Sequence, residues 1–393
     1  MKRFKINPQL DLPIESAQLL GHEKIVQNLK DFIESEDMIA PLSIAIHGEW
    51  GTGKTSIMQT LQNTINNKKV DTIFFEAWKY EYSNPALALV TTISEKYASA
   101  EGDAKAIITA AAYILADKFL GVDIQKAIEI IRGGKTQADT LSVTLEKLIA
   151  KKLENKKLII IIDDLDRCDV ENTLQLLALM KLFLGIKNCI CIAAVDFKRL
   201  EQAWIHKYGT DRASPNTGSQ YLDKIFQIRI GISQPTTKMM REYLQTLTTD
   251  IPEELLDLFS RLGPTNPRSV KKMLNLISYR RSLLNSDYND ITASLWTLLE
   301  VILSNSTTTF LYELFKKVGN TLGGAIRTNG DNWPGLKSVI EQQIQGITGG
   351  PNDAKLELFF TKSNSLARKY ELSAENLDAD FEILYSTTKE IPG

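Results

Sequence analysis

The segment "SIAIHGEWGTGKTS", residues 43–56, decides the fold that the sequence predicts. A short apolar run predicts a buried strand, a glycine-rich turn follows it, and a helical pattern begins at the lysine. Within the segment, Gly48–Thr55 matches the pattern G-x-x-x-x-G-K-[ST]. Glycines let the backbone curl so that successive amide N–H groups point at phosphate oxygens. The positive end of the helix faces the same anion, so the segment predicts a binding site for nucleotide phosphates.

Each position of this loop has an expected role. Lys54 is expected to reach the β- and γ-phosphates, and the hydroxyl of Thr55 is expected to bind Mg²⁺. The other nucleotide-binding positions are Gly48, Glu49, Trp50, Gly51, Thr52, Gly53 and Ser56. The chain has no N-K-x-D motif for reading guanine, so ATP is favoured over GTP. The expected cofactors are therefore ATP and Mg²⁺.

A second segment, "LIIIIDDLDRC" at 158–168, places acids at the end of an apolar strand. Asp163 is expected to hold the Mg²⁺ ion together with Thr55. One of the next two acids is expected to orient the attacking water, with Asp164 as the first choice and Asp166 as the second. For Asp166 the alternative is a cap on the helix that follows.

Further polar positions have two interpretations each. Asp196 ends another apolar strand, where it either senses the γ-phosphate or caps the next helix. Arg268 begins a later helix and either folds back onto the phosphates or stays solvated. Arg167 is either an arginine finger for a neighbouring subunit or the partner of an internal ion pair. Trp78, after an apolar strand, is expected to pack in the core.

The order of the predicted elements gives the fold class. Strands and helices alternate in residues 1–234, which predicts an α/β P-loop NTPase core with a parallel sheet flanked by helices. A mostly helical insert is expected at 84–156 within this core. Residues 235–286 are expected to form a helical, lid-like subdomain, and residues 287–393 a mostly helical C-terminal region.

Composition narrows the class of protein. The 393 residues carry a formal net charge of -2, so no general basic field for nucleic acid is present. Three cysteines suit a reducing cytoplasm rather than a disulfide framework. The apolar stretch at 106–116 is much shorter than the ~20 residues that span a membrane. A cytoplasmic protein without membrane attachment is expected.

One helix keeps a nucleic-acid partner open as an alternative. It carries the basic residues Lys271, Lys272, Arg280 and Arg281, with no acid between them. Such a run is more typical of a solvated helix face than of a nucleic-acid site.

These motifs together resemble the KAP family of P-loop NTPases, within the STAND-like branch of P-loop ATPases. Over about residues 10–285 they occur in the order of that family: "GEWGTGKTS", "FFEAWKYE", "IIIIDDLDRC", "AAVD", "YLDKIFQI" and "NPRSVKKMLN". The resemblance implies an ATPase, and it implies that Trp78 and Tyr80 are structural or close to the nucleotide. Family members act as regulators, as membrane-associated signalling scaffolds or in bacterial phage exclusion. Many carry membrane-spanning helices between the two Walker motifs, whereas residues 84–156 here contain no such segment.

The expected function is ATP hydrolysis coupled to a conformational change or to assembly, as a homo-oligomer or with a protein partner, through the helical regions. Three alternatives use the same site. They are a nucleotide-gated switch that hydrolyses slowly, a DNA-acting ATPase, and a kinase that passes the phosphate to an acceptor.

Overall fold

The computed structural model divides the chain into two compact units. Of the residues that the structure describes, the α/β unit contains those within His22–Ser233, and the helical unit contains the N-terminal residues up to Leu10, Leu19–Gly21 and those from Gln234 onward. The structure describes residues 6, 8–10, 19–97, 146–147, 149–150, 153, 156–208, 218–285, 287, 289–303, 305–317, 321–329, 332–341 and 351–389.

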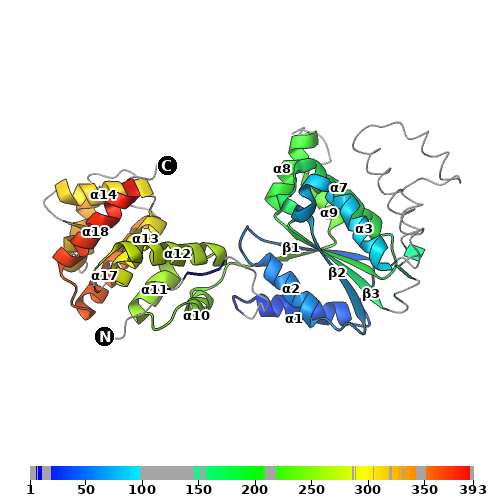
Figure 1. Cartoon of the computed structure of the whole chain (residues 1–393), viewed down its shortest axis with the longest axis horizontal. Coiled ribbons are helices and arrows are strands. Elements are labelled where there is room, and N and C mark those ends of the chain that lie inside the picture. Colours follow the sequence, from blue (N-terminus) through cyan, green and yellow to red (C-terminus); the bar gives the residue numbers. More distant parts are fainter. Residues whose placement is uncertain are drawn as a thin grey trace. The chain divides into compact units, whose positions relative to one another are not determined.

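The α/β unit is built on a parallel sheet, which is drawn in Figure 1. The strand order is β2-β3-β4-β1-β5. The strands are β1 (Leu42–His47), β2 (Val70–Glu76), β3 (Lys157–Asp163), β4 (Cys189–Val195) and β5 (Ile228–Gly231). The central strands are apolar almost throughout, as parallel strands covered on both faces must be. Because all strands run the same way, their carboxyl ends meet at one edge of the sheet. The glycine-rich loop and the acid cluster both lie at that edge.

Helices cover both faces of the sheet, as Figure 1 shows. The side chains of β3 alternate between two cores, with Ile159 and Ile161 facing α1 and α2, and Ile160 and Ile162 facing the helices on the other face. The first face holds α1 (His22–Glu34) and α2 (Lys54–Thr64), and the second holds α3 (Pro85–Tyr97), α7 (Val170–Phe183), α8 (Phe197–Tyr208) and α9 (Gly218–Ile225). The predicted α/β fold class is confirmed.

The helical unit contains the N-terminal residues as well as the second half of the chain. Ile6 is fully buried in its core, and the backbone of Gln9 and Leu10 is hydrogen-bonded by Asn275 and Lys271. The helices are α10 (Thr237–Leu247), α11 (Glu253–Leu262), α12 (Pro267–Leu283), α13 (Asn289–Ile302), α14 (Asn305–Lys317), α15 (Leu322–Gly324), η3 (Ala325–Asn329), α16 (Trp333–Glu341), α17 (Pro351–Lys369) and α18 (Ala374–Lys389). One apolar cluster runs through these helices.

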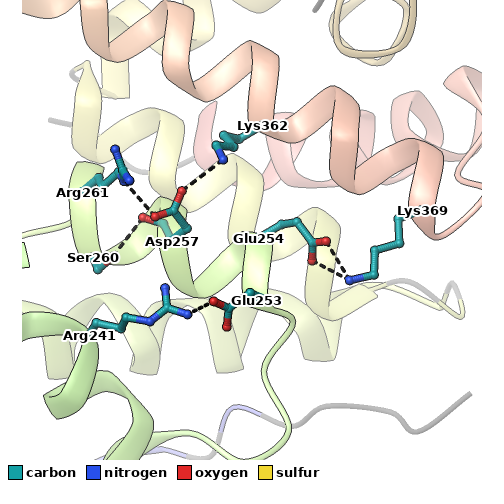
Figure 2. A network of polar contacts seen from close by, with 8 residues as sticks. All are labelled: Arg241, Glu253, Glu254, Asp257, Ser260, Arg261, Lys362 and Lys369. Carbon is teal, nitrogen blue, oxygen red and sulfur yellow. Dashed lines mark hydrogen bonds and ion pairs between the residues drawn. The ribbon is translucent and has the colours of Figure 1, made fainter. Parts of the chain in front are cut away.

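Ion pairs join α11 to α17 across this unit (Figure 2). The carboxylate of Glu254 accepts from Lys369 at 2.7 and 2.9 Å, and Asp257 pairs with Lys362 at 3.3 Å. Pairs as exposed as these contribute about 0.2–1 kcal/mol each, so the apolar cluster supplies most of the stability. The expected lid (235–286) and C-terminal region (287–393) thus lie within one compact unit, and a boundary at residue 286 stays a prediction.

Most of the expected helical insert at 84–156 lies outside the described residues, including the apolar stretch at 106–116. Its first part is described as α3. In the part of the chain that the structure describes, no helix combines the length and the apolar character needed to cross a membrane.

A buried ion pair fixes α12 against α13, which generates a test of the helical unit. Arg280 lies 2.5 Å from Glu300, and Glu300 also accepts from the indole of Trp296 at 3.0 Å. Replacing Glu300 with Ala leaves the buried guanidinium of Arg280 without its carboxylate partner. We therefore expect the free energy of unfolding to fall by about 3–5 kcal/mol. Urea denaturation followed by circular dichroism measures it. Lys316→Ala, which breaks an exposed pair with Glu382, is the control and should cost under about 1 kcal/mol. Equal losses in the two variants would contradict this account.

Candidate nucleotide and magnesium site

The glycine-rich loop connects β1 to α2 at the carboxyl edge of the sheet. Gly51 and Gly53 have φ values of +84° and +97°, in the region that favours glycine. Gly53 also lies against the imidazole of His22, so that a Cβ atom there would come within 2.5 Å of the ring. α2 begins at Lys54, directly after the loop, and its positive end therefore faces the loop.

His22, the first residue of α1, lies against the glycine-rich loop. The sequence did not predict a role for it. Its side chain is buried, and burial lowers the pKa of the imidazole although a hydrogen bond to the backbone of Thr52 opposes that shift. The only local signal is a histidine at a helix start, which does not reveal that its ring will contact Gly53. His22 therefore supports the loop by its contact with Gly53 and its hydrogen bond to the backbone of Thr52.

Lys54 is buried, with 8% of its surface exposed. Its ammonium donates to the carbonyl of Gly48 at 2.7 Å and to that of Glu49 at 3.2 Å. Burial lowers the pKa of Lys54, while the nearby carboxylates of Asp166, Asp196, Asp163 and Asp164 counteract the shift. The structure therefore brings the predicted lysine and the predicted acids together at one edge.

Thr55 and Asp163 are the two residues that the sequence predicts to hold Mg²⁺. Asp163 ends β3 and is only 2% exposed. Burial raises its pKa to about 6, repulsion by Asp164 adds to the rise, and a hydrogen bond with the side chain of Thr55 opposes it. A hydroxyl beside a buried carboxylate gives the hard oxygen ligands that Mg²⁺ uses together with phosphate oxygens and waters. Among the described residues no group of three or more His, Cys, Asp or Glu is placed so that it could hold a metal ion.

Asp164 has an unusual backbone, with φ 56° and ψ 27°. A left-handed conformation costs a non-glycine residue about 1–2 kcal/mol. The amide of Asp164 donates to Asp163 Oδ1 at 2.9 Å, and the amide of Arg167 donates to the carbonyl of Asp164 at 3.2 Å. Arg167 Nε also lies 2.8 Å from Asp164 Oδ1, so Arg167 forms the internal ion pair. Burial raises the pKa of Asp164, and Arg167 opposes that rise.

Asp166 and Asp196 are the other two carboxylates that act on Lys54. Asp166 is in η2 (Leu165–Arg167), and it is the carboxylate that most favours the charged form of Lys54. It also borders a cavity of about 270 Å³. The other residues that line this cavity are Cys168, Val170, Thr173, Arg199, Leu200, Gln202, Ala203 and His206. Asp196 follows β4 and accepts from the amide of Lys198 at 3.0 Å, so it caps α8 while its charge acts on Lys54. Both of its interpretations are compatible with this geometry.

The prediction that Trp78 packs in the core is wrong. β2 ends at Glu76, and the chain continues as the 3-10 segment η1 (Ala77–Ser83), which leaves Trp78 53% exposed. Its ring faces Arg167, with the guanidinium carbon 5.4 Å from the ring centroid. Tyr80 stacks on Phe75 instead, at 5.1 Å between centroids. Trp50 of the loop is also 49% exposed.

The remaining predicted residues lie in the helical unit. Arg268 is in the first turn of α12. The side chain of Asn266 caps this helix by accepting from the backbone amide of Arg268 at 3.0 Å. A role for Arg268 at the phosphates stays a prediction. The basic run of α12 is largely occupied within its own unit, because Arg280 is buried against Glu300, and Arg281 pairs with Asp290 at 3.2 Å. This occupancy weakens the nucleic-acid alternative.

Comparison with known proteins yields one family and several distant structures. The model of the KAP family P-loop domain matches residues 22–284. The chain is similar to the structure of Cdc6p from Pyrobaculum aerophilum, with 14% identity, coverage of 91% of this chain and 97% of that one, and a TM-score of 0.45. It is similar to the Orc1 protein of Aeropyrum pernix, solved in complex with DNA (10% identity, 96% and 85% coverage, TM-score 0.40). It is also similar to a RuvB variant from Thermotoga maritima (13% identity, 90% and 91% coverage, TM-score 0.37). No curated protein matches the chain.

The raised pKa of Asp163 predicts how stability depends on pH. The folded state binds this proton more tightly than the unfolded chain, whose ordinary pKa is 3.8, so stability falls as pH rises from about 4 to about 6. The difference between 3.8 and about 6, at 1.36 kcal/mol per pH unit, corresponds to roughly 3 kcal/mol. Without nucleotide and Mg²⁺, Asp163→Asn should therefore melt above the wild type at pH 8, and the difference should vanish near pH 4.

Scanning calorimetry at several pH values measures this difference, with MgATP as the internal control. Because the variant loses a ligand for the metal, MgATP should stabilise the wild type more than the variant, and the order of melting temperatures should reverse. A variant that melts below the wild type at pH 8 without nucleotide would contradict the burial effect.

Proposed function

Because the chain belongs to the KAP family of P-loop NTPases, we propose that it binds ATP together with Mg²⁺ and hydrolyses the ATP in the cytoplasm. The observation that carries this proposal is the buried ammonium of Lys54 at a glycine-rich loop, surrounded by carboxylates from the ends of β3 and β4. Burying an ammonium costs free energy, and the carboxylates and loop carbonyls offset that cost while keeping the charge at the loop whose motif predicts phosphate binding.

The loop residues divide the task of binding. Lys54 and the loop amides of Gly48–Thr55 would hold the β- and γ-phosphates, and binding would move the ammonium from the carbonyls of Gly48 and Glu49 towards phosphate oxygens. Thr55 and Asp163 would hold Mg²⁺, which supplies positive charge beside the phosphates. The hydrogen bond between these two side chains supports their assignment as a pair.

The hydrolytic step needs a base and a source of positive charge. Asp164 is the first choice for orienting water and accepting its proton, since it lies beside the metal ligand and is only partly buried. Asp166 is the second choice. A cation stabilises the charge on the transferred phosphoryl group, and it is Arg268 or an arginine from a neighbouring copy. Arg167 is less suited to this task in its own chain, because it already pairs with Asp164.

We propose that hydrolysis changes the relation between the α/β unit and the helical unit, and so alters assembly with a further copy or a protein partner. From Leu19 onward, the described chain passes between the units at Gly21–His22 and Ser233–Gln234, and His22 is in contact with the glycine-rich loop. A nucleotide that moves the loop would therefore act directly on the residue at one crossing point. A role in bacterial phage defence is proposed from family membership alone.

The hydrolytic function is tested by substitution at two positions. Lys54→Ala should abolish ATP binding, whereas Asp164→Asn should still bind ATP and lose turnover by about 10²-fold or more, the usual contribution of a general base. Calorimetric titration measures ATP binding, and a free-phosphate assay measures turnover. Asp166→Asn, tested in the same assays, shows whether the second-choice acid orients the water instead. Lys24→Ala, at an exposed position of α1, is the control and should change neither. Full turnover by Lys54→Ala would reject the proposal.

Light scattering on the same variants, with and without ATP, tests the coupling. If ATP drives assembly and Asp164→Asn holds the assembled form, hydrolysis times a switch. If all variants keep one size while the wild type turns over steadily, coupling through self-assembly is wrong. Labelled phosphate on an acceptor, rather than free phosphate, would identify a kinase instead.

A further inference from the structure

We infer that Trp78 is a positioning residue for Asp164, acting through Arg167; this inference rests on the proposed hydrolytic function. Core packing does not explain Trp78, because 53% of it is exposed. Its ring instead covers the guanidinium of Arg167. The three residues form a chain of contacts that runs from the surface to the carboxylate proposed to orient water.

The contact between Arg167 and Asp164 needs support from a third group. Arg167 Nε lies 2.8 Å from Asp164 Oδ1, but its N–H is not aligned with an acceptor as a hydrogen bond. The attraction is therefore one between charges, which fixes a distance and leaves the plane of the guanidinium undetermined. A flat aromatic surface defines that plane, since an arginine over a ring is held by the charge distribution of the ring.

Asp164 depends on this guanidinium for the direction of its side chain. Its backbone amide is engaged by Asp163 Oδ1, and its carbonyl by the amide of Arg167. These bonds hold the left-handed turn but leave the carboxylate free to rotate about its side-chain torsions. The ion pair with Arg167 restrains that rotation, and orienting water requires the carboxylate to be held in position.

Trp78 is itself held by a well-anchored segment. The carboxylate of Glu81 in η1 accepts from the amide of Asp169 at 2.7 Å, and the side chain of Asn172 donates to the carbonyl of Glu81 at 2.9 Å. The stacking of Tyr80 on Phe75 fixes the same segment to β2. η1 is thus attached to both β2 and the start of α7, and a ring presented from it keeps its place although one side faces solvent.

The kinetic test is a double-mutant cycle in the full chain. Trp78→Ala should lower kcat for ATP about fivefold, the size of one cation–π contact, and should leave KM within about twofold. Arg167→Met should lower kcat at least as much. Adding Trp78→Ala to Arg167→Met should have no further effect, because the indole would act only through the arginine. Trp78→Phe should restore most of the activity. Tyr82→Ala, a fully exposed position on the same segment, is the control and should behave as the wild type.

If the double variant lost kcat by the product of the two single-variant losses, the inference would be overturned, because Trp78 would then act independently of Arg167. A loss of activity that follows the melting temperature of each variant and is not restored by Trp78→Phe would also overturn it, since that pattern marks a merely structural role.

A readout that does not depend on activity separates this inference from the proposed function. With 5-fluorotryptophan in place of the five tryptophans, the ¹⁹F resonance of Trp78 is the one lost in Trp78→Phe. It should shift in Arg167→Met and in Asp164→Asn, and stay in place in Tyr82→Ala. If the Trp78 resonance keeps its position in both Arg167→Met and Asp164→Asn, the inference is overturned, whether or not ATP is hydrolysed. A shifting resonance in a protein without ATPase activity supports the contact chain and rejects the hydrolytic function.

Discussion

The burial of one positive charge constrains the rest of the α/β unit. The ammonium of Lys54 is removed from water, and a buried charge of this kind is tolerated only where opposite charges and acceptors surround it. The acceptors are the carbonyls of Gly48 and Glu49, which requires the loop to curl back over its own lysine. The opposite charges stand at the ends of β3 and β4, which requires both strands to run parallel to β1, with β4 beside β1 and β3 beside β4. The loop, the strand order and the acid cluster thus all contribute to stabilising the buried charge of Lys54.

Much of this arrangement could be predicted from the sequence, because it depends on local patterns. The glycine-rich motif and the apolar run before Asp163 each carry their own signal, and the parallel direction of the strands places them at one edge. What the sequence did not reveal depends on turns whose geometry is set by distant contacts. The 3-10 segment η1 turns Trp78 away from the core, and its anchor is Asp169, far along the chain. His22 contacts Gly53 for a similar reason, since no spacing rule connects a helix start with a loop thirty residues later.

The basic helix α12 shows why runs of charge are weak evidence. In the sequence its arginines have no acidic neighbours, which suggests either a solvated face or a nucleic-acid contact. In the fold, Arg280 turns inward to Glu300 and Arg281 reaches Asp290, both supplied by the next helix. The complementary charges were present in the sequence, but only the packing of α12 on α13 pairs them. The same holds for Arg167, whose internal role became visible only with the turn that brings it back to Asp164.

The N-terminal residues have a consequence for how the chain is made. Ile6 is buried in the helical unit, and Gln9 and Leu10 are held by side chains of α12, so this unit is assembled from both sides of the α/β unit in sequence. During synthesis the first segment therefore leaves the ribosome more than two hundred residues before its partners do. The described residues of the α/β unit all lie within His22–Ser233, so they are available earlier. The order of translation thus favours a nascent chain whose sheet is complete before the last helices of the helical unit have been synthesised.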